Sequence, residues 1–87
     1  MNYYFYSEKS GIKGLLNYKR MKIYLFDSRQ QAVEYAVEKY SVTKENPVGY
    51  IYSCAAVGMK QGENLNSGYK SDVPVQVTGC VPVENLL

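Results

Sequence analysis

Hydrophobic and polar residues recur along the first third of the chain in a way that predicts three elements. Residues 2–6, "NYYFY", are rich in aromatic side chains, as is typical of a short strand. Ser7 can cap a following helix, and apolar residues within 12–16 recur at the i, i+3, i+4 spacing of a buried helical stripe. The pattern therefore predicts a short helix up to about residue 16, and "MKIYLF" at 21–26 predicts the next strand.

Residues 28–40, "SRQQAVEYAVEKY", have the clearest helical pattern in the sequence. Ser28 and Gln31 form a capping-box pair, in which the hydroxyl and the amide each satisfy a free backbone N–H at the start of the helix. The predicted helix has one apolar stripe, which we expect to pack on a sheet. Its members are Ala32, Val33, Ala36, Val37 and Tyr40.

The last part of the chain predicts two strands separated by a polar connection. Residues 49–58, "GYIYSCAAVG", read as a strand buried on both faces, and residues 58–71 have the polar, glycine-rich composition of a loop or loose hairpin. Residues 73–83, "VPVQVTGCVPV", alternate as a strand does. Its prolines, Pro74 and Pro82, cannot donate to a ladder and predict a strand end or an edge.

The predicted order is β-α-β-α-β-β, which indicates one α+β domain over residues 1–87, with short helices packed on a small, mostly antiparallel sheet. A composition that is 46% hydrophobic and 21% charged is typical of a globular protein. The unusual feature is ten tyrosines against two phenylalanines. Tyrosine joins a large apolar ring to a hydroxyl that needs a partner, so it suits the margin of a small core and suits interfaces equally.

Charge gives only a weak indication of a partner. The net charge is +2, and the basic residues gathered in 9–22 are interpreted as a solvated surface in preference to a phosphate-binding patch. Nucleic-acid binding through this stretch, with Tyr18 and Tyr24 stacking on bases, is the weaker alternative. The first twenty residues carry both charge signs and no long apolar run, so we expect a cytoplasmic protein with no membrane segment.

The residue inventory excludes several kinds of catalytic site. The chain has no histidine, so Ser-His-Asp and Cys-His arrangements are impossible, and no metal site is expected. Cys54 and Cys80 both lie in apolar runs and lack Cys-x-x-Cys spacing. We expect them to be buried and reduced, and whether they ever pair stays open.

Three stretches of the chain resemble a known enzyme family. "KIYLFDSRQQAVEYA" is similar to the core of ADP-ribosyltransferase domains of the His-Tyr-Glu class, and "NSGYKSDVPVQVTGCV" resembles the end of the small rifampin-modifying members. The opening "YYFYSEKSGIKGLL" has the same family's layout. The resemblance implies an NAD cleft in which Tyr24 and Tyr35 flank the nicotinamide ring. It also implies that Glu63 is the nearest match to the catalytic glutamate and Asp72 a weaker one. The implied cleft is made up of Tyr4, Phe5, Tyr6, Tyr24 and Tyr35.

One residue of the implied cleft departs from the family pattern. Phe5 stands where the family has the histidine that hydrogen-bonds the NAD ribose, and a phenyl ring makes no such bond. We therefore predict a non-catalytic, inhibitory or protein-binding module on a trimmed ADP-ribosyltransferase-like fold, of a kind common in phages and mobile elements. The alternative is an NAD-binding protein or NAD-dependent transferase with a substituted site. Self-association through an edge strand at 73–83 is compatible with the binding module.

Overall fold

The structure is a computed structural model. It describes four parts of the chain, with backbone only in the third: residues 2–16, 24–57, 69–70 and 74–87. These residues contain six strands, one α-helix and one 3₁₀ helix. The elements are β1 (Asn2–Ser7), β2 (Leu15–Leu16), β3 (Tyr24–Leu25), α1 (Arg29–Tyr40), β4 (Tyr50–Ala56), β5 (Tyr69–Lys70), β6 (Val75–Pro82) and η1 (Val83–Leu86). The predicted α+β class with an antiparallel sheet is confirmed.

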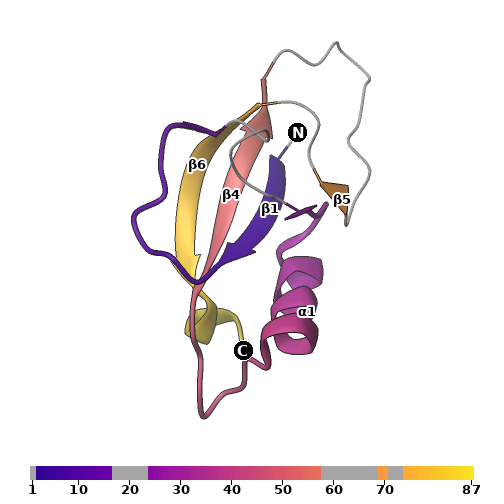
Figure 1. Cartoon of the computed structure of the whole chain (residues 1–87), viewed down its shortest axis with the longest axis vertical. Helices are drawn as coiled ribbons and strands as arrows, with labels where there is room; N and C mark the ends of the chain where they lie inside the picture. Colours follow the sequence, from indigo (N-terminus) through magenta and orange to yellow (C-terminus); the bar gives the residue numbers. More distant parts are fainter. Residues whose placement is uncertain (1, 17–23, 58–68, 71–73) are drawn as a thin grey trace.

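The strands form a curled antiparallel sheet. Its main part has the order β1-β4-β6-β2, and β3 pairs with β5 in a smaller, two-stranded sheet. The two sheets meet where the N–H of Tyr4 donates to the carbonyl of Phe26 at 2.9 Å and the N–H of Phe26 donates to the carbonyl of Tyr4 at 2.8 Å. Figure 1 shows β1, β4 and β6 side by side, with α1 lying next to β1. The bridge therefore brings the segment before α1 against β1.

The helix begins where the sequence predicts. Ser28 is the N-cap, and its Oγ accepts a hydrogen bond from the N–H of Gln31 at 3.2 Å. The side-chain oxygen of Gln31 accepts from the N–H of Asp27 at 3.2 Å, one residue before the cap. The helix ends at Ser41, which has a left-handed φ of 55° and donates its N–H to the carbonyl of Ala36. The predicted helix at 28–40 is confirmed. Backbone N–H groups at both of its ends form hydrogen bonds with residues that are close in the sequence.

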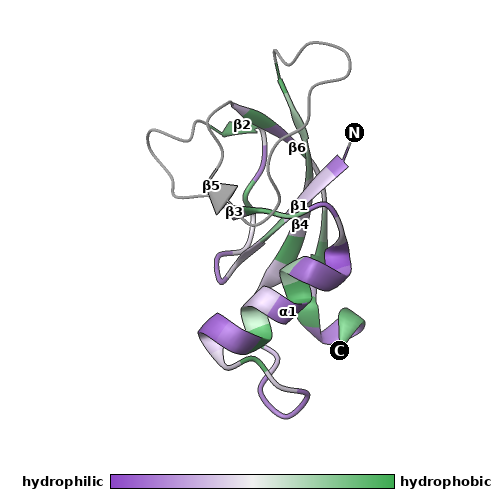
Figure 2. Cartoon of the chain, turned by 90° about the vertical axis from the view of Figure 1, so that its right-hand side faces the viewer, coloured by the Kyte–Doolittle hydropathy of each residue, from purple (hydrophilic) through white to green (hydrophobic). Residues whose placement is uncertain are grey.

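Side chains are buried on both faces of the sheet, in two clusters. Alternation along β1 sends Tyr3 and Phe5 to one face and Tyr4 and Tyr6 to the other, where α1 packs. Figure 2 shows hydrophobic residues along β4 and hydrophilic ones on the outer turns of α1. The cluster away from α1 consists of Tyr3, Phe5, Leu16, Leu25, Tyr52, Cys54 and Val75. The cluster under α1 consists of Tyr6, Phe26, Ala32, Val33, Ala36, Val42, Ile51 and Val83.

The helix predicted after Ser7 is wrong. The chain instead runs through an irregular segment over residues 8–14 and enters β2. Gly11 and Gly14 adopt left-handed φ values of 73° and 82°, which interrupt a right-handed helix. The hydroxyl of Tyr52 donates to the carbonyl of Lys9 and accepts from the N–H of Ile12 at 3.4 Å. The segment is therefore held by distant strands, while the side chain of Ile12 still packs against the core.

The two long C-terminal strands lie within their predicted ranges, but β6 is not an edge strand. It lies between β4 and β2, although β2 pairs only with Val75 and Gln76. Pro82 is the last residue of β6, as the prediction of a proline near a strand end requires. A register shift opposite Ser53 and Cys54 breaks the regular alternation of β6. Self-association through this strand stays a prediction.

Cys54 is buried as expected, but the expectation that Cys80 is buried is wrong, since Cys80 is exposed. Cys80 lies on the part of β6 that no described strand flanks on its outer side. Both thiols are free. Among the described residues, no helix has the length and apolar character needed to cross a membrane.

Candidate aromatic binding surface

Aromatic rings from three elements gather on the face of the sheet that α1 covers. In β1, alternation turns Tyr4 and Tyr6 to this face. Phe26 pairs directly opposite Tyr4, and Tyr24, two residues earlier, points to the same side. The helix contributes two more rings, so that side chains far apart in the sequence become neighbours. The six rings are Tyr4, Tyr6, Tyr24, Phe26, Tyr35 and Tyr40.

Tyr35 of α1 is the centre of this group. Its ring centroid lies 5.2 Å from that of Phe26 and 5.9 Å from those of Tyr24 and Tyr40. Tyr40 in turn lies 4.9 Å from Tyr6. Interplanar angles of 35° to 60° make all four contacts tilted ones, a favourable geometry for aromatic pairs. The rings therefore form one continuous row from β3, across the helix, to β1.

The rings of this group differ in how far solvent reaches them. Tyr24 is 40% exposed and Tyr40 is 47% exposed, while Tyr4 and Tyr35 are half-buried. Tyr6 and Phe26 are buried beneath them. We use the name aromatic surface for the accessible residues, which are Tyr4, Tyr24, Tyr35 and Tyr40. At one end of this surface the guanidinium carbon of Arg29 lies 5.6 Å from the ring centroid of Tyr4, within cation–π range.

The hydroxyls of Tyr6 and Tyr35 are hydrogen-bonding groups and not acids at neutral pH. Burial raises the pKa of the Tyr6 phenol, and the negative charge of Glu8 raises it further. Burial also raises the pKa of Tyr35, with additional contributions from Tyr40. The Tyr6 hydroxyl donates to the backbone carbonyl of Val48. These phenols stay protonated near pH 7 and so can orient or bind a partner without exchanging protons with it.

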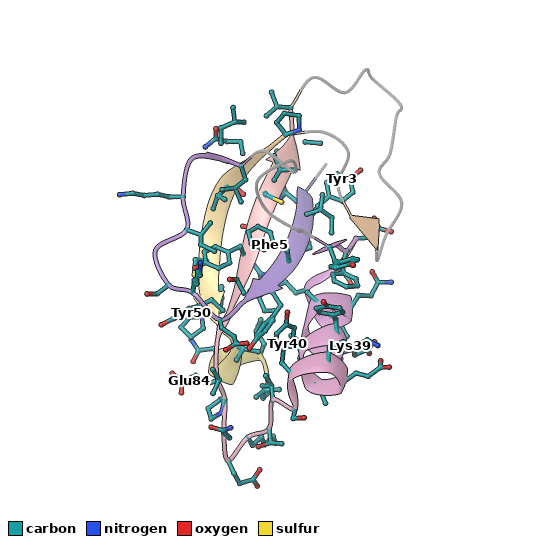
Figure 3. The ribbon with its side chains drawn as sticks, in the orientation of Figure 1. Tyr3, Phe5, Lys39, Tyr40, Tyr50 and Glu84 are labelled. Atoms are coloured by element: carbon teal, nitrogen blue, oxygen red, sulfur yellow. The ribbon has the colours of Figure 1, made fainter. Side chains whose placement is uncertain are left out.

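The structure brings together four of the five residues of the implied NAD cleft. Tyr4, Tyr6, Tyr24 and Tyr35 lie on the α1 face, but Phe5 lies on the opposite face. Phe5 is 3% exposed and its ring stacks on that of Tyr52, with centroids 5.0 Å apart and planes 13° apart. Figure 3 shows Phe5 over the strands of the sheet and Tyr40 beside α1. The position that resembles the family's histidine therefore does not open onto the aromatic surface.

Tyr24 and Tyr35 contact each other directly. A nicotinamide ring sandwiched between them needs about 7 Å between the two ring planes, twice the ~3.5 Å contact distance of carbon atoms. The centroids are 5.9 Å apart and the rings are tilted by 35°, so the pair is closed. Glu63 and Asp72, the candidates for the catalytic carboxylate, lie outside the described residues.

The helical pattern predicts Tyr40 in the buried stripe of the helix, and that prediction is wrong. The buried side of α1 is limited to Ala32, Val33 and Ala36, and Val37 is 45% exposed. The small side chains of Ala32 and Ala36 let the helix approach the sheet, while the large ring of Tyr40 in the last turn stays partly outside the core. A tyrosine in the last turn of a helix is the sequence signal that indicates such a residue, because its hydroxyl favours the margin of a core.

Other parts of the described chain offer less chemistry. A hollow of ≈ 390 Å³ near η1 has a polar lining made up of Lys44, Pro47, Glu84, Asn85 and Leu87. No group of three or more acidic or cysteine side chains converges within the described ranges. Of the basic stretch 9–22, residues 17–22, which include Tyr18, lie outside those ranges, so nucleic-acid binding stays a prediction. The chain matches no family model, no curated protein and no solved structure.

Proposed function

We propose that this chain is a non-catalytic module that binds another protein through its aromatic surface. The observation that carries the proposal is the row of packed rings with two exposed members, Tyr24 and Tyr40, held in place by Tyr35 between them. Tyrosine is enriched in protein interfaces and among the residues that dominate binding energy, because a rigid ring gives a large contact area at a small entropic cost.

The chemistry of the surface supports binding without catalysis. The whole chain lacks histidine, and the phenols of Tyr6 and Tyr35 have pKa values raised above an already high ordinary value. Neither of these two phenols therefore titrates near neutral pH, as an efficient general acid or base does. A surface of pre-packed rings instead offers a partner a contact area that needs little further ordering.

The binding proposal is tested with two double variants, each of which truncates two exposed side chains to alanine. Tyr24→Ala with Tyr40→Ala removes the exposed rings, and Leu15→Ala with Val57→Ala removes exposed apolar side chains, 60% and 43% accessible, outside the aromatic surface. Immobilised full-length chain is exposed to an extract of its native cell. We expect a protein that the wild type and the Leu15/Val57 variant retain and the tyrosine variant loses. Equal retention by both variants, or no retention by the wild type, contradicts the proposal.

NAD binding is the second candidate, and one observation favours it. Tyr24 and Tyr35 do meet on one surface, as the resemblance implies for the residues that flank nicotinamide. Binding requires these two rings to separate, and the loss of their contact costs about 0.5–1.5 kcal/mol. Titration with NAD up to millimolar concentration, followed through the tyrosine ring resonances in NMR spectra, separates the two candidates. Saturable shifts that Tyr35→Ala removes support NAD binding, and unchanged spectra contradict it.

A further inference from the structure

The Tyr4 end of the aromatic surface carries a guanidinium group. Arg29 is the first residue of α1, and its guanidinium carbon lies over the ring of Tyr4, 5.6 Å from the ring centroid. Tyr4 is joined to the other rings through Phe26, which pairs directly opposite it and whose ring lies 5.2 Å from that of Tyr35. A contact of its own side chain therefore places Arg29 on the aromatic surface. We call Arg29 and Tyr4 together the cationic end.

The guanidinium of the cationic end has no anionic partner among the described residues. Arg29 is exposed, and within the described ranges its side chain interacts with the ring of Tyr4 and forms no ion pair. Asp27, the nearest acidic residue in the sequence, precedes the N-cap of α1 and has an interaction of its own. Glu34 and Glu38 of α1 lie about 140° and 180° around the helix axis from Arg29. The N–H donors of the guanidinium are therefore available to a partner.

The contact with Tyr4 prepares the guanidinium to bind a carboxylate. The ring quadrupole attracts the cation, so the long side chain of Arg29 loses part of its freedom before any partner binds. The donors of a guanidinium form a planar fork that matches the two oxygens of a carboxylate. A partner that covers the neighbouring rings also excludes water from the cationic end, and this exclusion strengthens the attraction between opposite charges.

We propose that the partner protein places the carboxylate of an aspartate or glutamate side chain at the cationic end, where Arg29 binds both of its oxygens. Aromatic side chains next to that acid pack on the accessible rings of Tyr24 and Tyr35. The proposal rests on the proposed function, since the acid belongs to the protein that the aromatic surface binds. Charge complementarity with Arg29 selects the acid, and contact with the tyrosine rings selects its aromatic neighbours.

A short peptide tests the cationic end without knowledge of the partner. Acetyl-Phe-Glu-Phe-amide is titrated into the full chain, with acetyl-Phe-Gln-Phe-amide as the isosteric neutral control, and the NMR signals of the Arg29 Nε–H and the Tyr4 ring are followed. We expect saturable shifts of both signals with the glutamate peptide and about threefold weaker binding of the glutamine peptide. Arg29→Gln makes the two affinities equal. Lys39→Gln, which removes another exposed cation from α1, leaves their ratio unchanged.

Equal affinity of the wild type for the two peptides, binding of neither, or a preference that Arg29→Gln retains overturns the proposal. Inorganic phosphate that shifts the Arg29 signal when the glutamate peptide does not also overturns it, in favour of a phosphorylated partner.

Failure of this proposal is distinguishable from failure of the proposed function. A partner that is lost from the Tyr24/Tyr40 variant but retained by Arg29→Gln with unchanged affinity leaves the protein-binding function standing and removes the carboxylate site. Glutamate-specific shifts of Arg29 in a chain that retains no protein leave the site and remove the function.

Discussion

At the scale of single residues, Gly49 shows most directly how closely the ring of Tyr6 is packed. Its φ of 104° is one that residues with a side chain rarely adopt, and a Cβ at this position would lie 2.6 Å from ring carbons of Tyr6. The same tyrosine donates its hydroxyl to the carbonyl of Val48, immediately before. The turn into β4 therefore needs glycine for two independent reasons, its backbone conformation and the approach of the ring.

Gly49→Ala is predicted to destabilise the chain by about 3 kcal/mol, from a left-handed backbone cost and an overpacked ring contact. Gly11→Ala is the matched control. It has a φ of 73°, but a Cβ there meets nothing within 4 Å, so we expect only about 1 kcal/mol. Urea unfolding followed by circular dichroism measures both free energies. Equal losses for the two variants contradict the close approach of Tyr6 to Gly49.

The thiol of Cys54 makes stability depend on alkaline pH. Burial raises its pKa from 9.0 to about 12 in the folded chain, because the thiolate is disfavoured in the core. A group whose pKa is higher in the folded state contributes stability that is complete below its unfolded pKa and is lost as pH rises through the folded value. The free energy of unfolding should therefore fall as pH rises from 9.0 toward 12. Tyr6, Tyr35 and Tyr52, whose pKa values are also raised, add to the fall above their ordinary value of 10.0.

Urea unfolding of the reduced chain between pH 7 and 11 measures this slope. Cys54→Ala removes the contribution of the thiol and makes the dependence shallower, although the variant is less stable at pH 7 because the side chain becomes smaller. A stability that is constant or rises over the alkaline range is incompatible with a buried, protonated Cys54.

At the scale of elements, one hydroxyl bonds two backbone groups of the segment over residues 8–14. Tyr52 in β4 is fully buried, and its hydroxyl bonds backbone groups at Lys9 and Ile12. Tyr52→Phe removes both bonds and keeps the ring, so we expect a loss of about 1–2 kcal/mol. We also expect faster hydrogen exchange at the Ile12 amide. Tyr50→Phe, a half-buried neighbour in the same strand, is the control and should change neither quantity by a comparable amount.

The contrast between α1 and this segment shows which elements the sequence could predict. The helix is defined by local signals, namely the cap at Ser28 and the stripe of Ala32, Val33 and Ala36. The segment before β2 has a helical spacing of apolar residues, yet Ile12 bonds to a residue 40 positions away. A partner this far away in the sequence fixes the local backbone conformation, and the local spacing of apolar residues does not indicate it. The register shift opposite Ser53 and Cys54 was unpredictable for the same reason.

At the scale of the whole molecule, the two faces of the sheet differ in how far their aromatic rings are exposed. One face packs Phe5 on Tyr52 in a buried cluster, and the other carries the rings that remain accessible. Successive residues of a strand point to opposite faces, so Tyr4, Phe5 and Tyr6 never line one cleft together. The resemblance predicted Tyr24 and Tyr35 on either side of a ligand ring, and the two rings do lie on one surface but contact each other. It did not identify Tyr40, whose exposure depends on where the helix ends over the sheet.

Phe5→His tests this separation of faces. The imidazole replaces a ring that is 3% exposed and stacked on Tyr52, so burial of its polar nitrogens should cost about 2–4 kcal/mol. Because the side chain at this position faces away from Tyr24 and Tyr35, we expect the variant to gain no NAD binding. Phe5→Leu, which stays apolar, should lose less stability. Denaturation and an NAD titration measure the two effects, and NAD binding gained by Phe5→His contradicts the placement of this residue.

The central claim, that the aromatic surface contacts a partner protein, is tested most directly by site-specific photo-crosslinking in the native cell. A photoreactive p-benzoyl-phenylalanine replaces Tyr40 in one full-length chain and Lys13, exposed on the irregular segment over the other face, in a second. We expect one discrete protein adduct from position 40 and none of that mass from position 13. The same adduct from both positions, or an adduct from position 13 alone, contradicts the claim.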